Sequence, residues 1–311
     1  MSVNFSAKSL QTSIQWLLEC PVLLDHQQHP VLLASALPPA SQPVVQDLTN
    51  SMEALQEELQ GKRHHLLGVY YETLWQAIFR HLPDTQVISC NRQVQADKRT
   101  LGEFDLIYYC RIRKAYVHRE MAVKFYLGLP DSDSLAGWFG PGLDDRFDRK
   151  VDRLLNHQSV LSQTPEGRHS LEALGITGVI SEILLQGCLF YPFEGSLSAP
   201  TLLSDRHLHG DWLPVSALNH YIETRKIDAI THLNKTQWMT PPLNSLTSSI
   251  TKADIHKIDW LHNSTTALFK QYRGPIMLAG LTSMDEQYCE ASRFFLVPDD
   301  WENLARLRLH Q

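Results

Sequence analysis

Hydrophobic residues recur at helical spacing in four stretches of the chain. In the first of these stretches, Leu10, Ile14 and Leu17 fall on one stripe of a short helix. A segment rich in Ala, Ser and Pro, residues 34–43, separates this helix from the second and is typical of a linker. The pattern predicts helices over residues 6–18, 46–60, about 64–81 and about 143–161.

Runs of β-branched, aromatic and other apolar residues predict strands between and after these helices. We expect them over residues 85–95, 103–110, 116–126 and 178–191, with two further strands over 275–281 and 293–298. The order helix, three strands, helix, strand implies an α/β fold with a central mixed β-sheet flanked by helices. We expect three regions: an N-terminal helical region (1–62), a core (63–195) and a C-terminal α+β region (196–311) packed on the core.

Composition narrows the class of protein without identifying a function. Of the 311 residues, 43% are hydrophobic and 20% are charged, which is ordinary for a soluble globular protein. The net charge of −6 argues against a surface coated in basic charge for non-specific nucleic-acid binding. It leaves room for a local basic groove.

Targeting and cysteine signals are also weak. Residues 1–15 lack the basic start and apolar stretch of a signal peptide, and no run approaches the roughly 18–20 apolar residues of a membrane span. The five cysteines are far apart and form no CxxC pair, which argues against a disulfide framework and a cysteine zinc site. We therefore expect a cytoplasmic protein with no membrane partner; its oligomeric state is unknown from the sequence.

Two of the predicted strands carry the residues with the most chemistry. The runs are Gly102–Tyr109 and His118–Tyr126. Because side chains two apart on a strand point the same way, Glu103 shares a face with Asp105, and Glu120 shares a face with Lys124. If the strands are neighbours, one polar face carries carboxylates beside a lysine.

Such a face has the residue types of phosphodiester hydrolysis. Hard cations such as Mg²⁺ bind carboxylate oxygens and keep several waters. A bound ion polarises a phosphoryl oxygen and lowers the pKa of a bound water, and a nearby lysine orients that water or neutralises charge. The alternative is a half-buried antiparallel hairpin with a charged outer face, because Glu and Lys are common on exposed strand faces.

The helix before these strands adds a further carboxylate, Glu72. That helix is apolar nearly all round, and Val69, Trp75 and Phe79 lie on the side of Glu72. A carboxylate among large apolar groups needs a partner such as a cation or a metal. The alternative is that Glu72 lies at the rim of the apolar stripe and reaches water.

A helix with a glutamate, then the sequence GEFD, then a strand ending in a lysine resembles the PD-(D/E)XK nuclease superfamily. More narrowly, the chain resembles an uncharacterised bacterial family called domain of unknown function 1853. The narrower resemblance covers most of the chain. The stretches that carry it are residues 67–72, 102–105, 120–127, 138–142 with Asp145-Arg146, 154–158 and 295–299.

The superfamily resemblance implies a restriction-endonuclease-like core and cleavage of nucleic acid, DNA or RNA, that depends on Mg²⁺ or Mn²⁺. It assigns the helical glutamate of the pattern to Glu72, the aspartate to Asp105 and the lysine to Lys124.

One position departs from the superfamily pattern. The pattern has an acidic residue or glutamine two residues before the lysine, and this chain has Ala122 there. Glu120 lies on the same face but a further two residues upstream, which is roughly 6.7 Å along the strand. Three outcomes stay open: Glu120 leans into the space beside Ala122, Glu103 supplies the second carboxylate, or the metal site is lost and the fold survives as a binding module.

Basic residues form a stripe on the helix expected to begin near Leu143. At about 100° per residue they fall on one side, with aspartates on another. Such a stripe is able to track a phosphate backbone; the alternative is a solvated face with pairs such as Asp145–Arg149. The candidate nucleic-acid-binding residues are Arg146, Arg149, Lys150 and Arg153.

The sequence favours a metal-dependent nuclease as the leading hypothesis. Asp105 and Glu120 would bind Mg²⁺, with Glu72 or Glu103 completing the set of ligands, and Lys124 would position the attacking water. The competing hypothesis is a catalytically inactive module that binds nucleic acid or protein on a decayed nuclease fold.

Overall fold

The computed structural model describes residues 7–33, 55–57, 59, 66–97, 99–242, 255–256, 269, 274–284 and 287–309. The chain divides into two compact units, each built from several stretches. The first unit contains residues 1–123, 150–186 and 202–206, and the second contains 124–149, 187–201 and 207–311. The chain therefore passes from one unit to the other in the middle of two strands, after Val123 and after Gln186. The three consecutive regions expected from the sequence stay a prediction.

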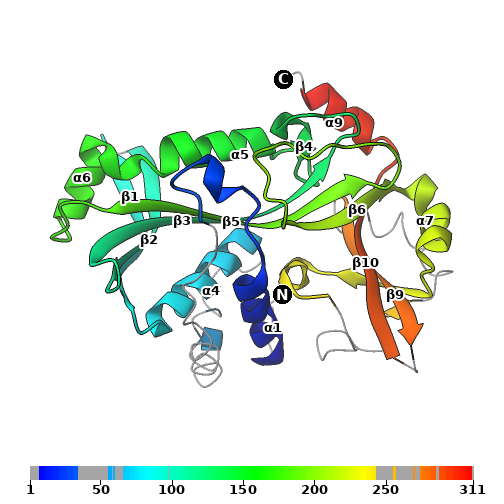
Figure 1. Ribbon diagram of the computed structural model, residues 1–311, viewed down its shortest axis with the longest axis horizontal. Helices are drawn as coiled ribbons and strands as arrows, with labels where there is room; N and C mark the ends of the chain where they lie inside the picture. The colour runs from blue at the N-terminus through cyan, green and yellow to red at the C-terminus, as the bar shows by residue number, and fades with distance from the viewer. Residues whose placement is uncertain are drawn as a thin grey trace. The chain divides into compact units, whose positions relative to one another are not determined.

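The first unit is a sheet with helices on its faces (Figure 1). Its strands follow the order β1-β2-β3-β5, and β1, β2 and β3 are antiparallel neighbours. On one face, α6 covers a core that includes Phe104 and Ile107 of β2. Its elements are α1 (Ala7–Glu19), α4 (Leu67–His81), β1 (Thr85–Ala96), β2 (Arg99–Cys110), α6 (Pro165–Glu172) and the first parts of β3 (Ala115–Gly128) and β5 (Ile180–Pro192).

The second unit continues β3 and β5 and adds a further set of strands. From β5 the order is β5-β6-β10-β9-β7-β8. The pairs β5–β6 and β6–β10 are parallel and the remaining pairs are antiparallel, so the sheet is mixed. The elements are β4 (Trp138–Phe139), β6 (Leu208–Pro214), α7 (Leu218–Arg225), β7 (Ala229–Leu233), β8 (Ile255–His256), β9 (Ile276–Met284), β10 (Gln287–Val297) and α9 (Trp301–Leu309).

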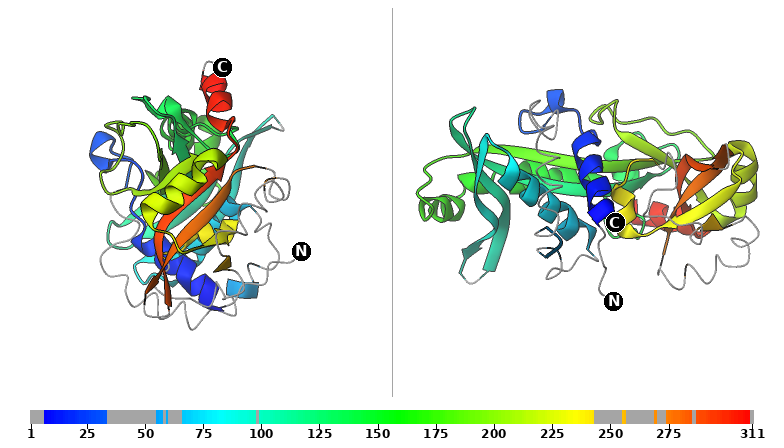
Figure 2. Two further views of the ribbon diagram at one scale, coloured as in Figure 1. Left: turned by 90° about the vertical axis from the view of Figure 1, so that its right-hand side faces the viewer. Right: turned by 90° about the horizontal axis from the view of Figure 1, so that it is seen from below.

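The helix α7 covers the hydrophobic core of the second unit. Figures 1 and 2 show α7 beside the strands that include β10. Leu218 and Tyr221 of α7 pack with Leu213 of β6 and Phe294 of β10 in one buried cluster. The apolar positions of the strands and the helix are therefore hidden from water together, which stabilises the layer arrangement.

The predicted fold class is confirmed, since a large mixed sheet is flanked by helices. The strands and the first helix lie within a few residues of their predicted positions. The helix predicted over 46–60 falls mainly outside the described residues. The helix predicted from Leu143 begins later: α5 spans Phe147–Arg153. Leu143 has a φ of 65°, a left-handed conformation that a right-handed helix cannot include.

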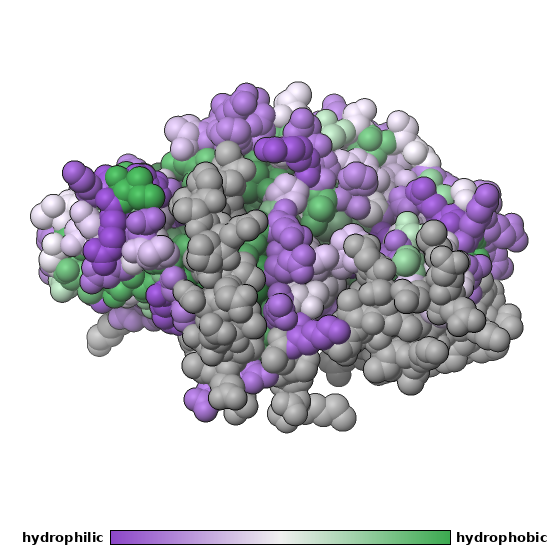
Figure 3. All heavy atoms as spheres, turned by 60° about the horizontal axis from the view of Figure 1, so that its bottom comes forward, coloured by the Kyte–Doolittle hydropathy of each residue, from purple (hydrophilic) through white to green (hydrophobic). Residues whose placement is uncertain are grey.

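The described surface mixes hydrophilic and isolated hydrophobic residues, as Figure 3 shows for one face. A few large apolar side chains are exposed, which is normal for a folded protein. In the part of the chain that the structure describes, no helix is long and apolar enough to cross a membrane.

A buried glutamine, Gln186 of β5, connects two helices to the sheet of the first unit through hydrogen bonds. Its Nε2 donates hydrogen bonds to the carbonyl oxygens of Leu17 (2.9 Å) and Cys20 (2.7 Å) at the end of α1. Its Oε1 accepts from the hydroxyl of Tyr71 (2.8 Å) and the indole N–H of Trp75 (3.2 Å) on α4. The side chain is fully buried, so these bonds replace water on both ends of the amide.

We expect Gln186→Leu to destabilise the protein strongly. The leucine would leave buried donors and acceptors without partners, each costing about 1–3 kcal/mol, so the free energy of unfolding should fall by at least about 3 kcal/mol. Urea denaturation measures the change. Gln11→Leu, at an exposed position of α1, is the matched control and should change stability by less than about 0.5 kcal/mol. Equal effects of the two substitutions would contradict the structural role of Gln186.

Candidate functional site

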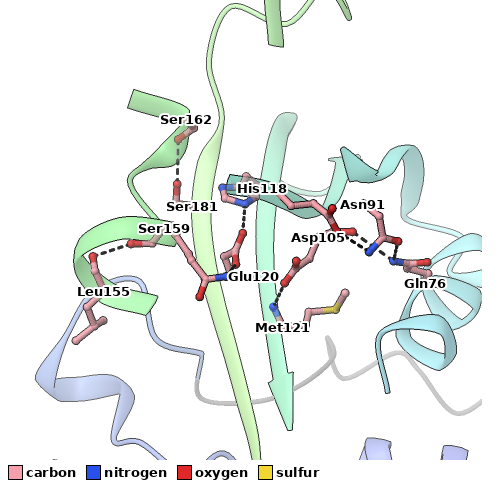
Figure 4. A network of polar contacts seen from close by, with 12 residues as sticks. Gln76, Asn91, Asp105, His118, Glu120, Met121, Leu155, Ser159, Ser162 and Ser181 are labelled. Atoms are coloured by element: carbon pink, nitrogen blue, oxygen red, sulfur yellow. Dashed lines mark hydrogen bonds and ion pairs between the residues drawn. The ribbon is translucent and has the colours of Figure 1, made fainter. Parts of the chain in front are cut away.

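The candidate site begins where strands β2 and β3 stop pairing through their main chains. The ladder between them runs from Cys110–Ala115 to Leu106–Arg119. At the next residue, a side-chain acceptor replaces the main-chain carbonyl: the carboxylate Oδ2 of Asp105 accepts a hydrogen bond from the main-chain N–H of Met121 at 2.9 Å. Asp105 is thereby fixed against β3, with only 9% of its surface exposed (Figure 4).

Glu120 of β3 lies beside Asp105 and is completely buried. One carboxylate oxygen contacts Nε2 of His118 at 2.7 Å, and the other accepts from Nε2 of Gln158 at 2.5 Å. Glu120 and Asp105 follow directly after the last paired residues of the two strands, and repulsion from Glu120 is, after burial, the main cause that raises the pKa of Asp105. The two carboxyl groups are therefore direct neighbours, and the expected alternative of a charged outer face is wrong for this pair.

Two further carboxyl groups face the same region through Asn91 of β1. The Nδ2 of Asn91 donates to Glu103 at 3.0 Å, and the influence of Asn91 also lowers the pKa of Glu72 on α4. The Oδ1 of Asn91 accepts from Gln76 of α4 at 2.6 Å. Asn91 has a φ of 50°, a conformation that asparagine adopts more readily than most residues. This turn of the main chain lets one side chain join α4 to β2.

The electrostatics of these groups are those of crowded, buried acids. Burial, followed by repulsion from Asp105 and Glu103, raises the pKa of Glu72 to about 8. Burial and then repulsion from Glu120 raise the pKa of Asp105 to about 7. Burial likewise raises the pKa of Glu120 to about 7. Near neutral pH the cluster therefore holds shared protons, which a cation would displace.

His118 is buried beside this cluster and is neutral near pH 7. Burial lowers its pKa to about 4. Its ring packs edge-on against Phe104, with ring centroids 4.6 Å apart. His118 is therefore a neutral hydrogen-bonding partner that holds Glu120 in place. It does not supply a positive charge to balance the carboxylate.

The lysine assigned by the superfamily resemblance has a partner of its own. Lys124 follows Val123, the last residue of β3 in the first unit, and belongs to the second unit. Its ammonium group pairs with Oδ2 of Asp145 at 2.5 Å. The structure thus brings Glu72, Glu103, Asp105 and Glu120 together, and it gives Lys124 an acidic neighbour in the second unit.

The predicted basic stripe separates into two kinds of residue. Arg149 and Arg153 are exposed. Arg146 forms a two-point ion pair with Asp148 and is only 15% exposed. Lys150 donates to Oε1 of Gln158 at 3.2 Å. Arg149 and Arg153 are therefore the residues of the stripe most open to an external phosphate.

The pattern analysis missed the positions of Lys150, Gln158 and Asn91 beside the carboxyl groups. Lys150 lies on α5, and Gln158 is the last residue of the π-helical turn Leu154–Gln158 that follows it. Assuming a regular helix, the periodicity placed Lys150 with the exposed arginines. Leu154, midway between Lys150 and Gln158 and buried, is the one sequence signal that this side of the helix faces the sheet.

The donor set fits magnesium better than a transition metal. Among the described residues, no group of three or more His, Cys, Asp and Glu side chains is arranged to hold a metal ion. Mg²⁺ commonly uses only one or two carboxylates and completes its octahedron with water and substrate phosphate. The adjacent carboxyl groups of Asp105 and Glu120 meet that smaller requirement.

Comparison with known proteins gives a family and no activity. A family model described as a domain of unknown function, DUF1853, matches residues 12–297. No curated protein matches the chain, and no solved structure matches it.

The raised pKa values predict how stability depends on pH. Glu72 has a pKa of about 8 in the folded protein against 4.5 ordinarily, so the folded state binds this proton more tightly than the unfolded state. Stability from this proton is complete below pH 4.5 and is lost as the pH rises through about 8. Asp105 and Glu120 act in the same direction, each with a pKa of about 7.

We therefore expect the free energy of unfolding, measured in urea, to fall between about pH 6.5 and pH 8. His118 does not oppose this trend there, because it is neutral in both states above its ordinary pKa of 6.5. Glu72→Gln should make the fall shallower. Glu172→Gln, at an exposed position of α6, should leave the slope unchanged. A flat or rising profile for the parent protein would contradict the buried acidic cluster.

Proposed function

The chain belongs to the family described as domain of unknown function 1853, and we propose that it is a metal-dependent nuclease-like protein. Its reaction would be hydrolysis of phosphodiester bonds in DNA or RNA. The observation that carries this proposal is the buried contact between Asp105 and Glu120 at the point where β2 and β3 stop pairing.

The resemblance to the PD-(D/E)XK superfamily supports the same reaction. Its main weakness was Ala122, which stands where the pattern has an acid. The burial of the Glu120 carboxyl group close to Asp105 supports Glu120 as the acid that replaces it. We propose that these two carboxylates act on one ion.

Asp105 and Glu120 would hold Mg²⁺ or Mn²⁺, with Glu72 or Glu103 completing the set of ligands. When bound, such an ion polarises a phosphoryl oxygen and lowers the pKa of a water that attacks the phosphorus. The residues of the chain keep the carboxylates in place: the Met121 N–H orients Asp105, while His118 and Gln158 orient Glu120. Fixed ligands reduce the reorganisation that the reaction would otherwise need.

The resemblance assigns the water-positioning role to Lys124, and Arg149 and Arg153 are the proposed contacts to the nucleic-acid backbone. Both arginines are exposed on α5. Arginine side chains at such positions neutralise phosphates without reading sequence. The overall charge of −6 makes a local contact of this kind more plausible than broad electrostatic attraction.

A second candidate is a catalytically inactive module on the same fold. It is favoured by the hydrogen bonds at Glu120, where both carboxylate oxygens have partners within the protein. In that case the cluster would serve as a buried polar network, and binding of nucleic acid or protein would use the exposed surface.

Cleavage assays with Mg²⁺ or Mn²⁺ test the enzyme. We expect cleavage of at least one substrate among duplex DNA, single-stranded DNA and RNA. Asp105→Asn should lower the rate by about 100-fold or more, the scale of losing one group that stabilises the transition state. Asp152→Asn, at an exposed carboxylate of α5, is the matched control and should retain the parent rate.

Calorimetry separates the two candidate functions without a substrate. The enzyme should bind Mn²⁺ with a dissociation constant of about 1 mM or tighter, and Asp105→Asn should abolish that binding. If neither ion binds and no substrate is cut, the inactive module is the correct function and the nuclease proposal fails.

The exposed arginines should control binding to nucleic acid. We expect the double substitution of Arg149→Glu and Arg153→Glu to weaken binding to labelled DNA or RNA at low salt, because each charge reversal adds repulsion from phosphate. The salt dependence of binding should also become less steep. The double substitution of Arg111→Glu and Arg168→Glu, both at exposed positions away from α5, changes net charge equally and should weaken binding much less. Equal losses would assign the effect to net charge instead.

A further inference from the structure

Lys150 lies on the side of α5 that faces the carboxyl pair, although the sequence pattern places it with the exposed arginines. Four residues later on the same helical run, Leu154 is 1% exposed and packs into the protein. A further four residues on, Gln158 reaches Glu120. Lys150 itself is partly buried.

The turn that links these residues is not a regular α-helix. Residues Leu154–Gln158 are π-helical, and the N–H of Ser159 bonds to the carbonyl oxygen of Leu154 at 3.0 Å. A wider turn rotates less per residue than the ordinary 100°, which keeps Gln158 on the side of Lys150. The local widening thus aligns two polar side chains toward β3.

A continuous chain of hydrogen bonds leads from Lys150 to the carboxyl pair. The ammonium group of Lys150 donates to Oε1 of Gln158 at 3.2 Å. Nε2 of Gln158 donates to Glu120 at 2.5 Å, and Glu120 acts electrostatically on Asp105. All four residues belong to the first unit.

The charge of Lys150 also acts directly on both acids. After burial, attraction by Lys150 has the largest influence on the pKa of Glu120, which it lowers. It lowers the pKa of Asp105 as well. Lys124, by comparison, has its ammonium group paired with Asp145 in the second unit.

We infer that Lys150 is the lysine of this site: it balances the carboxyl pair in the metal-free protein and contacts the substrate phosphate once a divalent ion is bound. The inference rests on the proposed nuclease function and reassigns a role that the superfamily pattern gives to Lys124. The four flexible methylene groups of lysine let its ammonium group move between two anionic partners at little cost. A divalent ion that takes over the carboxylates would free it for an anionic phosphate.

Two measurements on the same variants test this role. In Lys150→Ala the rate of Mg²⁺-dependent cleavage should fall by about 100-fold, while Mn²⁺ should bind the protein several times more tightly, because the competing cation is gone. General damage to the fold would weaken both. Lys150→Arg restores a charge at this position and should recover part of the rate. Lys8→Ala, at an exposed position of α1, is the control for loss of one lysine.

Lys150→Gln covers the case in which the alanine variant fails to fold. It keeps a donor for Gln158 but removes the charge, so it too should bind Mn²⁺ more tightly and cleave slowly. A circular dichroism melt confirms folding of each variant.

The outcomes separate this inference from the proposed function. If the parent cleaves and the Lys150 variants cleave equally well, while Lys124→Ala does not, the lysine is Lys124 and the inference is wrong. Weaker Mn²⁺ binding in a folded Lys150→Gln variant would also overturn it. If the parent protein itself cleaves no substrate, the proposed nuclease function is wrong. The catalytic role of Lys150 is then wrong as well.

Discussion

Two buried carboxyl groups repel each other whenever both are ionised. The structure around Asp105 and Glu120 has to accommodate this repulsion. With 9% and 0% of their surfaces exposed, they gain little from water. Hydrogen bonds from the surrounding protein replace the lost contacts with water. The Met121 N–H bonds Asp105, and His118 and Gln158 bond the two carboxylate oxygens of Glu120. What remains is the excess negative charge, which protons relieve in the metal-free protein and which a divalent cation would relieve better.

Keeping these two carboxyl groups close together requires that the surrounding elements stay in place. In the first unit, buried polar contacts away from the site hold those elements. Gln186 attaches α1 and α4 to β5. Arg119 neighbours Glu120 on β3 but points to the opposite face, where it pairs with the buried Glu182 of β5 and lies over the ring of Phe79. Breaking either contact would leave unpaired buried groups, so the positions of α4 and β3 are strongly specified.

The geometry gives the family of unknown function a chemical hypothesis with defined parts. In the proposed function, a two-carboxylate site, a cationic lysine and exposed arginines would carry out phosphodiester hydrolysis once magnesium and a phosphate complete the coordination. In the proposed function, Glu120 on the same strand replaces the acid that the superfamily pattern has at the position of Ala122. If Lys150 serves the site, the positive charge has also changed element, from a strand to a helix, while the chemical requirement for it is unchanged.

The sequence alone was enough to predict the fold class, because alternation of apolar residues reports the period of each helix and strand directly. It also singled out Glu72, Glu103, Asp105 and Glu120, since acids within apolar segments are costly and stand out. It was unable to decide whether Glu120 meets Asp105, which depends on where β2 and β3 stop pairing. Nor was it able to place Lys150 and Gln158, because a π-helical turn breaks the 100° period on which the pattern rests. Such contacts join residues on separate elements, and only tertiary packing decides which of them meet.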